Sequence, residues 1–130
     1  MTRDLLADAT TAALAKTLDG AAARHRALAE NIANVDTPGF QRVDVAFETE
    51  LQAALKDAQA NPRTALDRIA TVRPRQSRDT VSPARVDGNN VDVDREMARI
   101  AQNTQEYEAA ARALATKLRM LRSAISEGKR

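Results

Sequence analysis

Apolar side chains recur at alternating steps of four and three residues along the last third of this 130-residue chain. This C-terminal seam runs for five heptads through Val93, Met97, Ile100, Thr104, Tyr107, Ala111, Leu114, Leu118, Leu121 and Ile125. A period of 3.5 residues sustained over this length is typical of a coiled coil and hard to explain as a globular core helix. Residues 91–130 are therefore predicted to form a long helix that packs along another helix, with Asp92 as its N-cap.

A second seam of the same period lies near the N-terminus. This N-terminal seam consists of Leu14, Leu18, Ala21, His25, Leu28, Ile32 and Val35. It predicts a helix within residues 1–37, in which Gly20 marks either a close helix contact or a bend. Asn31 and Asn34 lie beside the seam, where their amides can bond a partner helix or the backbone of the following turn.

The N-terminal helix must end at a proline-glycine corner. Pro38 disfavours a helical conformation at Thr37, and the pair Pro38-Gly39 predicts a type II turn in which Gly39 has a positive φ. Pro38, Gly39 and Phe40 are therefore the expected corner residues.

The predicted fold is all-α, with the two long terminal helices packed as an antiparallel coiled coil. The antiparallel sense follows if the chain folds back at the corner and re-enters helix near Asp92. Pairing Val35 with Val93 then fixes a register in which Tyr107 faces Ala21. A large side chain facing a small one fills the space between helices at native density.

The corner leads into a short segment within residues 38–56. Residues 43–47 alternate like an extended strand, and Phe47, Leu51 and Leu55 then recur every four residues. The pattern predicts about two turns of helix with a small apolar face. This face either folds back on the long helices or serves another purpose.

Residues 57–90 are predicted to be a largely irregular connection. Within them, residues 61–86 hold three of the four prolines, no glycine, no aromatic residue, and six arginines against two aspartates. Such a composition is not expected to build a core, and it suggests a solvated loop that is ordered against neighbouring molecules.

Composition limits how much core the chain can bury. It has 27 alanines, two phenylalanines, one tyrosine and no tryptophan. Ordering the backbone costs about 1–2 kcal/mol per residue, so we expect oligomerisation to supply part of the stability. The net charge of +2, from 20 basic and 18 acidic residues, is too balanced to indicate a polyanionic partner.

The sequence offers no membrane or secretion signal. No apolar run approaches the roughly 20 residues that span a bilayer, and residues 1–20 lack the basic start and apolar stretch of a cleavable signal peptide. No transmembrane segment is therefore expected. The residues by themselves favour a cytosolic protein.

No catalytic or metal-binding set is recognisable. The chain has one histidine, His25, no cysteine and no glycine-rich phosphate loop. The acids of residues 87–96 do not form an EF-hand, because Asp92 stands where that loop requires glycine. We therefore expect no enzyme, no cofactor and no metal.

Two functional classes remain open on these grounds. One is a cytoplasmic coiled-coil adaptor, which the two seams would suit. The other is a basic helical nucleic-acid binder, which is less favoured because no aromatic residue is interleaved among the arginines for base stacking. No nucleic-acid partner is therefore expected.

Two segments carry a resemblance to a known family. Residues 28–40, LAENIANVDTPGF, resemble the signature near the N-terminus of bacterial flagellar axial proteins, the rod and hook family. A second match lies in residues 87–96, DGNNVDVDRE, and in the helix that follows with Tyr107 and residues 118–122. Together they resemble the proximal-rod members of this family more closely than the others.

The resemblance implies a structural subunit of the proximal rod that transmits torque. Its implied partners are copies of itself, other rod proteins, and the membrane-ring and export-gate proteins at the rod base. It also implies export through the flagellum's own type III apparatus, without cleavage, to the periplasmic part of the basal body. Phe47 and Leu51 are similar to the Phe-x-x-x-hydrophobic motif that is read at the export gate.

Overall fold

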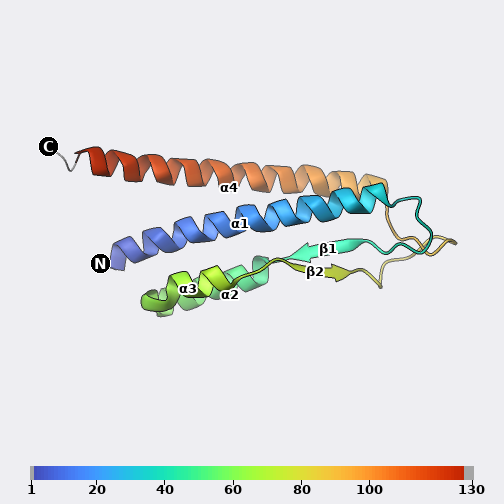
Figure 1. Ribbon diagram of the computed structural model, residues 1–130, viewed down its shortest axis with the longest axis horizontal. Coiled ribbons are helices and arrows are strands. Elements are labelled where there is room, and N and C mark those ends of the chain that lie inside the picture. Colours follow the sequence, from blue (N-terminus) through green and yellow to red (C-terminus); the bar gives the residue numbers. More distant parts are fainter. Residues whose placement is uncertain (1, 128–130) are drawn as a thin grey trace.

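Two long helices, α1 (Thr2–Ala33) and α4 (Val93–Glu127), run antiparallel along the length of the molecule (Figure 1). The computed structural model describes residues 2–127, with side chains from residue 9 onward. Between the helices the chain forms β1 (Val43–Ala46), α2 (Glu48–Ala60), a 3-10 turn η1 (Pro62–Thr64), α3 (Ala65–Thr71) and β2 (Arg75–Arg78). The described part of the chain is thus mostly helical, with one small antiparallel sheet. The antiparallel sense of the long helices is confirmed.

Helix α1 is the middle layer of the molecule. In Figure 1, α4 lies along one side of α1, and the β1–β2 sheet with α2 and α3 lies along the other. Ala9 and Ala13 pack against α2 and α3, while Ala23 and Ala27 pack against β1. Because alanine has a single methyl group, one helix can approach two layers closely without a large side chain holding either away.

The main apolar cluster lies between α1 on one side and α2 and α3 on the other. It contains Ala9, Ala13, Phe47, Leu51, Ala54, Ala58, Ala65, Ile69 and Val72. Phe47 is only 3% exposed, and its ring packs directly on Gly20 of α1. A Cβ atom at position 20 would lie 2.4 Å from the Phe47 ring, so of the two readings of Gly20 the close contact is correct.

The prediction of an irregular connection is wrong for residues 57–78. The end of α2, η1, α3 and β2 occupy most of this stretch, and the longest run without helix or strand is residues 79–92. The composition was misleading because this stretch shares a core with α1 and α2. Ala65, Ile69 and Val72 need only complete a surface that the alanines of α1 already provide. The predicted strand and helix at residues 43–55 are confirmed by β1 and α2.

The prediction that the C-terminal seam packs on α1 is wrong. The face of α4 that lies against α1 carries the buried residues Glu96, Asn103 and Ala110. Each stands one position before a seam residue, a step of about 100° around the helix. Asn103, not Tyr107, therefore takes the place opposite Ala21, because its amide donates to the Ala21 carbonyl at 2.8 Å. Tyr107 lies at the margin of the interface, where it is 43% exposed and lines a groove with Ala21.

Hydrogen bonding explains why α4 is turned this way. Glu96 and Asn103 both bond groups on α1, and the small Ala110 permits close approach between the helices. A buried polar group with partners specifies one orientation more strongly than an apolar seam that a neighbouring molecule can also cover. The apolar residues Met97, Leu118, Leu121 and Ile125 are left exposed by the same rotation.

The helix ends follow local signals. Asp92 caps α4 as predicted, since its side chain accepts from the Arg95 amide at 3.2 Å. Helix α1 ends at Ala33, and after the following turns the Phe40 amide donates to the Thr37 carbonyl at 3.2 Å. Gly39 within this turn has a φ of 72°. Residues 128–130, the last of the predicted C-terminal helix, lie outside the described residues.

We predict that Gly20→Ala destabilises the protein although alanine is the better helix former. Alanine should gain about 1 kcal/mol of helix propensity, but overpacking against Phe47 should cost about 1–3 kcal/mol. Chemical denaturation should therefore show a lower free energy of unfolding, and Phe47→Leu should restore part of it in the Gly20→Ala background. Ala29→Gly, at an exposed site of the same helix, is the control and should cost about 1 kcal/mol. A clear gain in stability for Gly20→Ala would contradict the packing described.

Candidate functional site

A buried set of polar side chains joins the end of α1 to the start of α4. We call Asn31, Arg42, Asn89, Asn90 and Glu96 the polar clasp. Four of them are at most 5% exposed, which is unusual for charged and amide groups in so small a protein. The clasp comes from segments that are more than 40 residues apart in sequence.

Glu96 is the centre of the clasp and is 1% exposed. One carboxylate oxygen accepts from the Arg42 Nε at 2.8 Å, and the other accepts from the Asn31 amide at 2.8 Å. A carboxylate withdrawn from water is tolerated only when it is paired and hydrogen-bonded in this way. Glu96 thereby ties α4 both to α1 and to the segment that leads into β1.

Arg42 uses the rest of its guanidinium group on two more carboxylates. It donates to both oxygens of Asp44, at 3.0 and 3.2 Å, and to Asp79 at 3.2 Å. Burial by itself would lower the pKa of Arg42, but the hydrogen bonds to Asp44 and Glu96 raise it above its ordinary value. Arg42 therefore remains charged and links β1, α4 and the loop that follows β2.

Asp79 orders that loop as well as facing Arg42. Its carboxylate accepts from the Ser82 hydroxyl at 2.6 Å, from the Ser82 amide at 2.9 Å and from the Val81 amide at 3.0 Å. These bonds, the Ser82 hydroxyl first among them, lower the pKa of Asp79 well below its usual range. Asp79 is ionised at neutral pH, and its contribution to stability is lost only as the pH falls below about 4, the ordinary pKa of a free aspartate.

The asparagines of the clasp hold the two turns together. Asn89, 0% exposed, donates to the carbonyls of Asn34 at 2.9 Å and Thr37 at 2.8 Å. These carbonyls follow the end of α1, where backbone acceptors lack helical partners. The two turns also touch directly, since the Gly39 amide donates to the Asp87 carbonyl at 2.8 Å. Gly88 has a φ of 81°, and a Cβ atom there would lie 3.3 Å from the Gly39 Cα.

Asn31 and Asn34 have different partners. The Asn31 side chain bonds the Val43 amide at 2.7 Å and the Val43 carbonyl at 2.9 Å, in addition to Glu96. The Asn34 side chain stays local, donating to the Glu30 carbonyl and accepting from the Thr37 hydroxyl. Asn31 thus joins elements, whereas Asn34 stabilises the turn.

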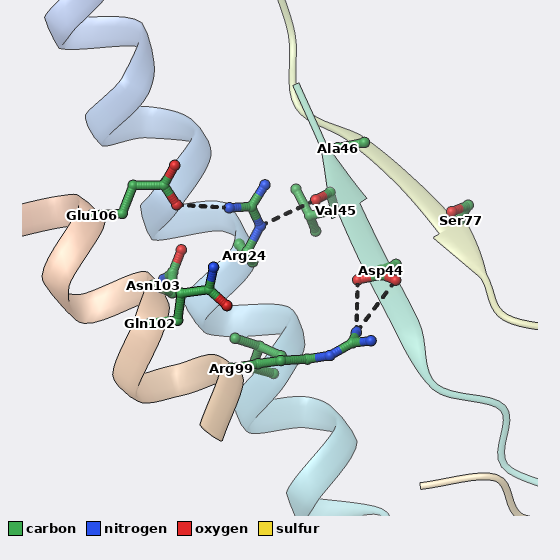
Figure 2. Close-up of a pocket in the computed structure, with 10 residues that line it drawn as sticks. Arg24, Asp44, Val45, Ala46, Ser77, Arg99, Gln102, Asn103 and Glu106 are labelled. Atoms are coloured by element: carbon green, nitrogen blue, oxygen red, sulfur yellow. Dashed lines mark hydrogen bonds and ion pairs between the residues drawn. The ribbon is translucent and has the colours of Figure 1, made fainter. Parts of the chain in front are cut away.

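A polar cleft of about 510 Å³ opens beside the clasp, between α1, α4 and the sheet (Figure 2). Arg24 reaches Glu106 across it at 3.1 Å, and Arg99 reaches Asp44 at 3.3 Å. Each cation that lines the cleft therefore meets a carboxylate. The residues described contain no group of three or more histidine, aspartate or glutamate side chains placed to hold a metal ion. The arrangement is suited to holding elements together, not to chemistry on a substrate.

The residues predicted from the sequence fall into three environments. Leu28, Asn31, Phe47 and Leu51 are buried, and Leu14, Leu18, Ile32, Asn34, Val35, Phe40, Ile100 and Leu114 are half-buried. Pro38, Gly39, Met97, Tyr107, Leu118, Leu121 and Ile125 are exposed, as is His25. Of the exposed members of the C-terminal seam, Tyr107 lines a groove with Ala21 and His25 of α1.

Sequence reasoning missed Arg42, Glu96, Asn89 and Asn103. Apolar periodicity cannot find such residues because they look like surface positions in the pattern. Two signals were available: Asn89 and Glu96 lie in the family-like segment 87–96, and Glu96 and Asn103 are seven residues apart, the spacing of one face of a long packed helix. None of the helices described is long and apolar enough to cross a membrane.

Comparisons with known proteins place this geometry in a family. Residues 83–127 match the model described as flagellar basal body rod FlgEFG protein C-terminal. The chain is 37% identical over 102 residues to the flagellar basal body rod protein FlgB of Borrelia hermsii, covering 69% of this chain and 76% of that protein. It is 33% identical to FlgB of Escherichia coli strain K12 over 119 residues, covering 82% and 86%. The chain therefore belongs to the FlgB family of flagellar basal body rod proteins.

Proposed function

We propose that this protein is a building block of the proximal rod, joining the membrane-ring and export-gate base to the rest of the rod and transmitting torque. Its partners in this proposal are copies of itself, other rod proteins and the proteins of the rod base. The family supports a structural rod subunit, and the cleft and clasp offer no catalytic set among the residues described. A cytoplasmic adaptor could carry a similar seam, but family membership favours the rod.

The observation that carries the proposal is the exposed C-terminal seam of α4. Met97, Tyr107, Leu118, Leu121 and Ile125 are 54, 43, 51, 39 and 64% exposed. No residue of α4 beyond Ala110 is buried among those described. A helix that keeps a heptad apolar seam on its open side is suited to coiled-coil packing with a helix of a neighbouring subunit.

The polar clasp suits a part that carries mechanical load. A rod subunit must pass force between neighbours without its two long helices sliding past each other. An apolar interface between helices gives little resistance to such sliding. Glu96, in contrast, can keep its hydrogen bonds to Asn31 and Arg42 in only one position of α4 along α1. We propose that the clasp fixes α1 and α4 as one unit at the end where the turns meet.

Export adds a second demand, which Phe47 and Leu51 are proposed to meet. Both side chains are buried in the folded chain, at 3 and 7% exposed. They are accessible to an export gate only before the chain folds. In this proposal the motif is read in the unfolded chain, which then folds on the periplasmic side and buries the same two residues in its core.

Aspartate on the C-terminal seam should block assembly without unfolding the subunit. We predict that Leu118→Asp with Leu121→Asp changes the thermal midpoint of the isolated protein by only a few degrees, because both side chains are exposed. In bacteria that lack their own FlgB, the double variant should fail to restore basal bodies and swimming. Ser123→Asp, an exposed position on the same helix, is the control and should restore both. Normal swimming of the double variant would refute the proposed interface.

A substitution elsewhere in the same core can separate an effect on export from an effect on stability. Phe47→Ala with Leu51→Ala should lower the amount of protein leaving the cell, and it should also destabilise the fold, since Phe→Ala and Leu→Ala in a core cost about 3–5 and 2–5 kcal/mol. Ile69→Ala removes a 0% exposed side chain from the same cluster and should leave export intact. If secretion by immunoblot falls equally for both, Phe47 and Leu51 act only as core residues.

A further inference from the structure

The two outer edges of the small sheet differ in their hydrogen bonding. The outer edge of β1 is closed by side chains of α1, because Asn31 bonds both the amide and the carbonyl of Val43. The Val45 carbonyl on the same edge accepts from Arg24 Nε at 3.2 Å. Side chains here occupy the place of a third strand.

The outer edge of β2 is open. The backbone amides and carbonyls of Val43 and Val45 point toward α1. Those of Asp44 and Ala46 therefore point toward β2, where they bond the paired residues Ser77 and Arg75. The amides and carbonyls of Gln76 and Arg78 must then point away from the sheet. These groups have no partner among the residues described, and all four residues of β2 are exposed.

The open edge is held rigid. Pairing continues past β2, where the Asp79 amide donates to the Arg42 carbonyl at 2.9 Å. The Asp79 side chain then fixes the next turn and faces Arg42 of the clasp. Val81, at the end of this ordered stretch, is 92% exposed. An edge that is already extended and ordered loses little conformational entropy when a strand is added to it.

Charge indicates which strand would be accepted. Residues 73–78, RPRQSR, hold three arginines and no acid. Arg75 is paired with Glu50 at an exposed site, and Arg78 has no ion-pair partner among the described residues. Arginines on an edge oppose pairing with the same edge of a second copy, while they favour a strand that carries carboxylates.

We propose that the outer edge of β2 takes an extended acidic segment of a neighbouring basal-body protein as a third antiparallel or parallel strand. Backbone groups of Gln76 and Arg78 would supply the hydrogen bonds, and Arg75 and Arg78 the selection for acid. The inference rests on the proposed function, because the neighbour is a component of the assembled basal body.

Amide hydrogen exchange tests the proposal directly. In the free protein, the amides of Gln76 and Arg78 should exchange fast while that of Ser77 is protected by β1. In isolated basal bodies, Gln76 and Arg78 should exchange at least about tenfold more slowly. Unchanged rates in basal bodies that contain the protein would overturn this inference alone. Absence of the protein from basal bodies would instead overturn the proposed function, and this inference with it.

A pair of proline variants supplies a second test. Gln76→Pro removes only an outward amide and should leave the thermal midpoint within a few degrees of the wild type, while swimming is lost. Ser77→Pro removes a bond to β1 and should lower the midpoint as well. Arg78→Glu should abolish the slow exchange at position 76 in basal bodies, and Arg78→Lys should retain it. Full swimming by Gln76→Pro, or equal protection in both Arg78 variants, would contradict the acidic strand.

Discussion

The carboxylate of Glu96 is the constraint on which the rest of this structure depends. It lies on the face of α4 that meets α1, and it is withdrawn from water. A charge in that position forces its neighbours to satisfy it, and Asn31 and Arg42 do so from α1 and from the segment before β1. These bonds help to fix the rotation of α4 and the position of β1, while Asn89 holds the two turns together nearby. An unpaired charge at Glu96 would be strongly destabilising, by about 3–5 kcal/mol.

The same constraint determines what the molecule leaves exposed. With Glu96 and Asn103 facing α1, several apolar residues of α4 are left exposed, among them Met97, Leu118 and Ile125. Within the described chain, some polar side chains of α4 are buried and much of its apolar seam is exposed. In a helix pair that folds on its own, apolar side chains are buried and polar ones are exposed. The arrangement of α4 is reasonable only if neighbours cover the seam. In the proposed rod, helix α4 thus has two tasks: the clasp fixes it to α1, and its seam packs against neighbouring subunits.

The sequence predicted the long elements well and their contacts poorly. Heptad periodicity located both terminal helices, and Asp92 located the start of α4, because these signals act within a few residues. Helix α1 ends at Ala33, before the proline-glycine pair. The face of α4 that meets α1 was predicted wrongly. The spacing of apolar residues does not tell whether their seam packs on α1 or on another molecule. Helix α3 was missed because Ile69 is buried against residues distant in sequence, in α2 and in α1, with the alanines of α1 about 60 residues away. Asn31 was identified from its place beside the seam, whereas Arg42 gave no local signal for its burial.

A double-mutant cycle across Asn31 and Glu96 tests most directly whether the clasp couples the end of α1 to the start of α4. The free energies of unfolding of Asn31→Ala, Glu96→Ala and the double variant are measured by denaturant titration with two independent probes. Because the bond between them joins an amide to a buried carboxylate, we predict a coupling energy of about 1–3 kcal/mol. Additive effects, with a coupling near zero, would contradict the clasp as the interaction that holds α1 against α4.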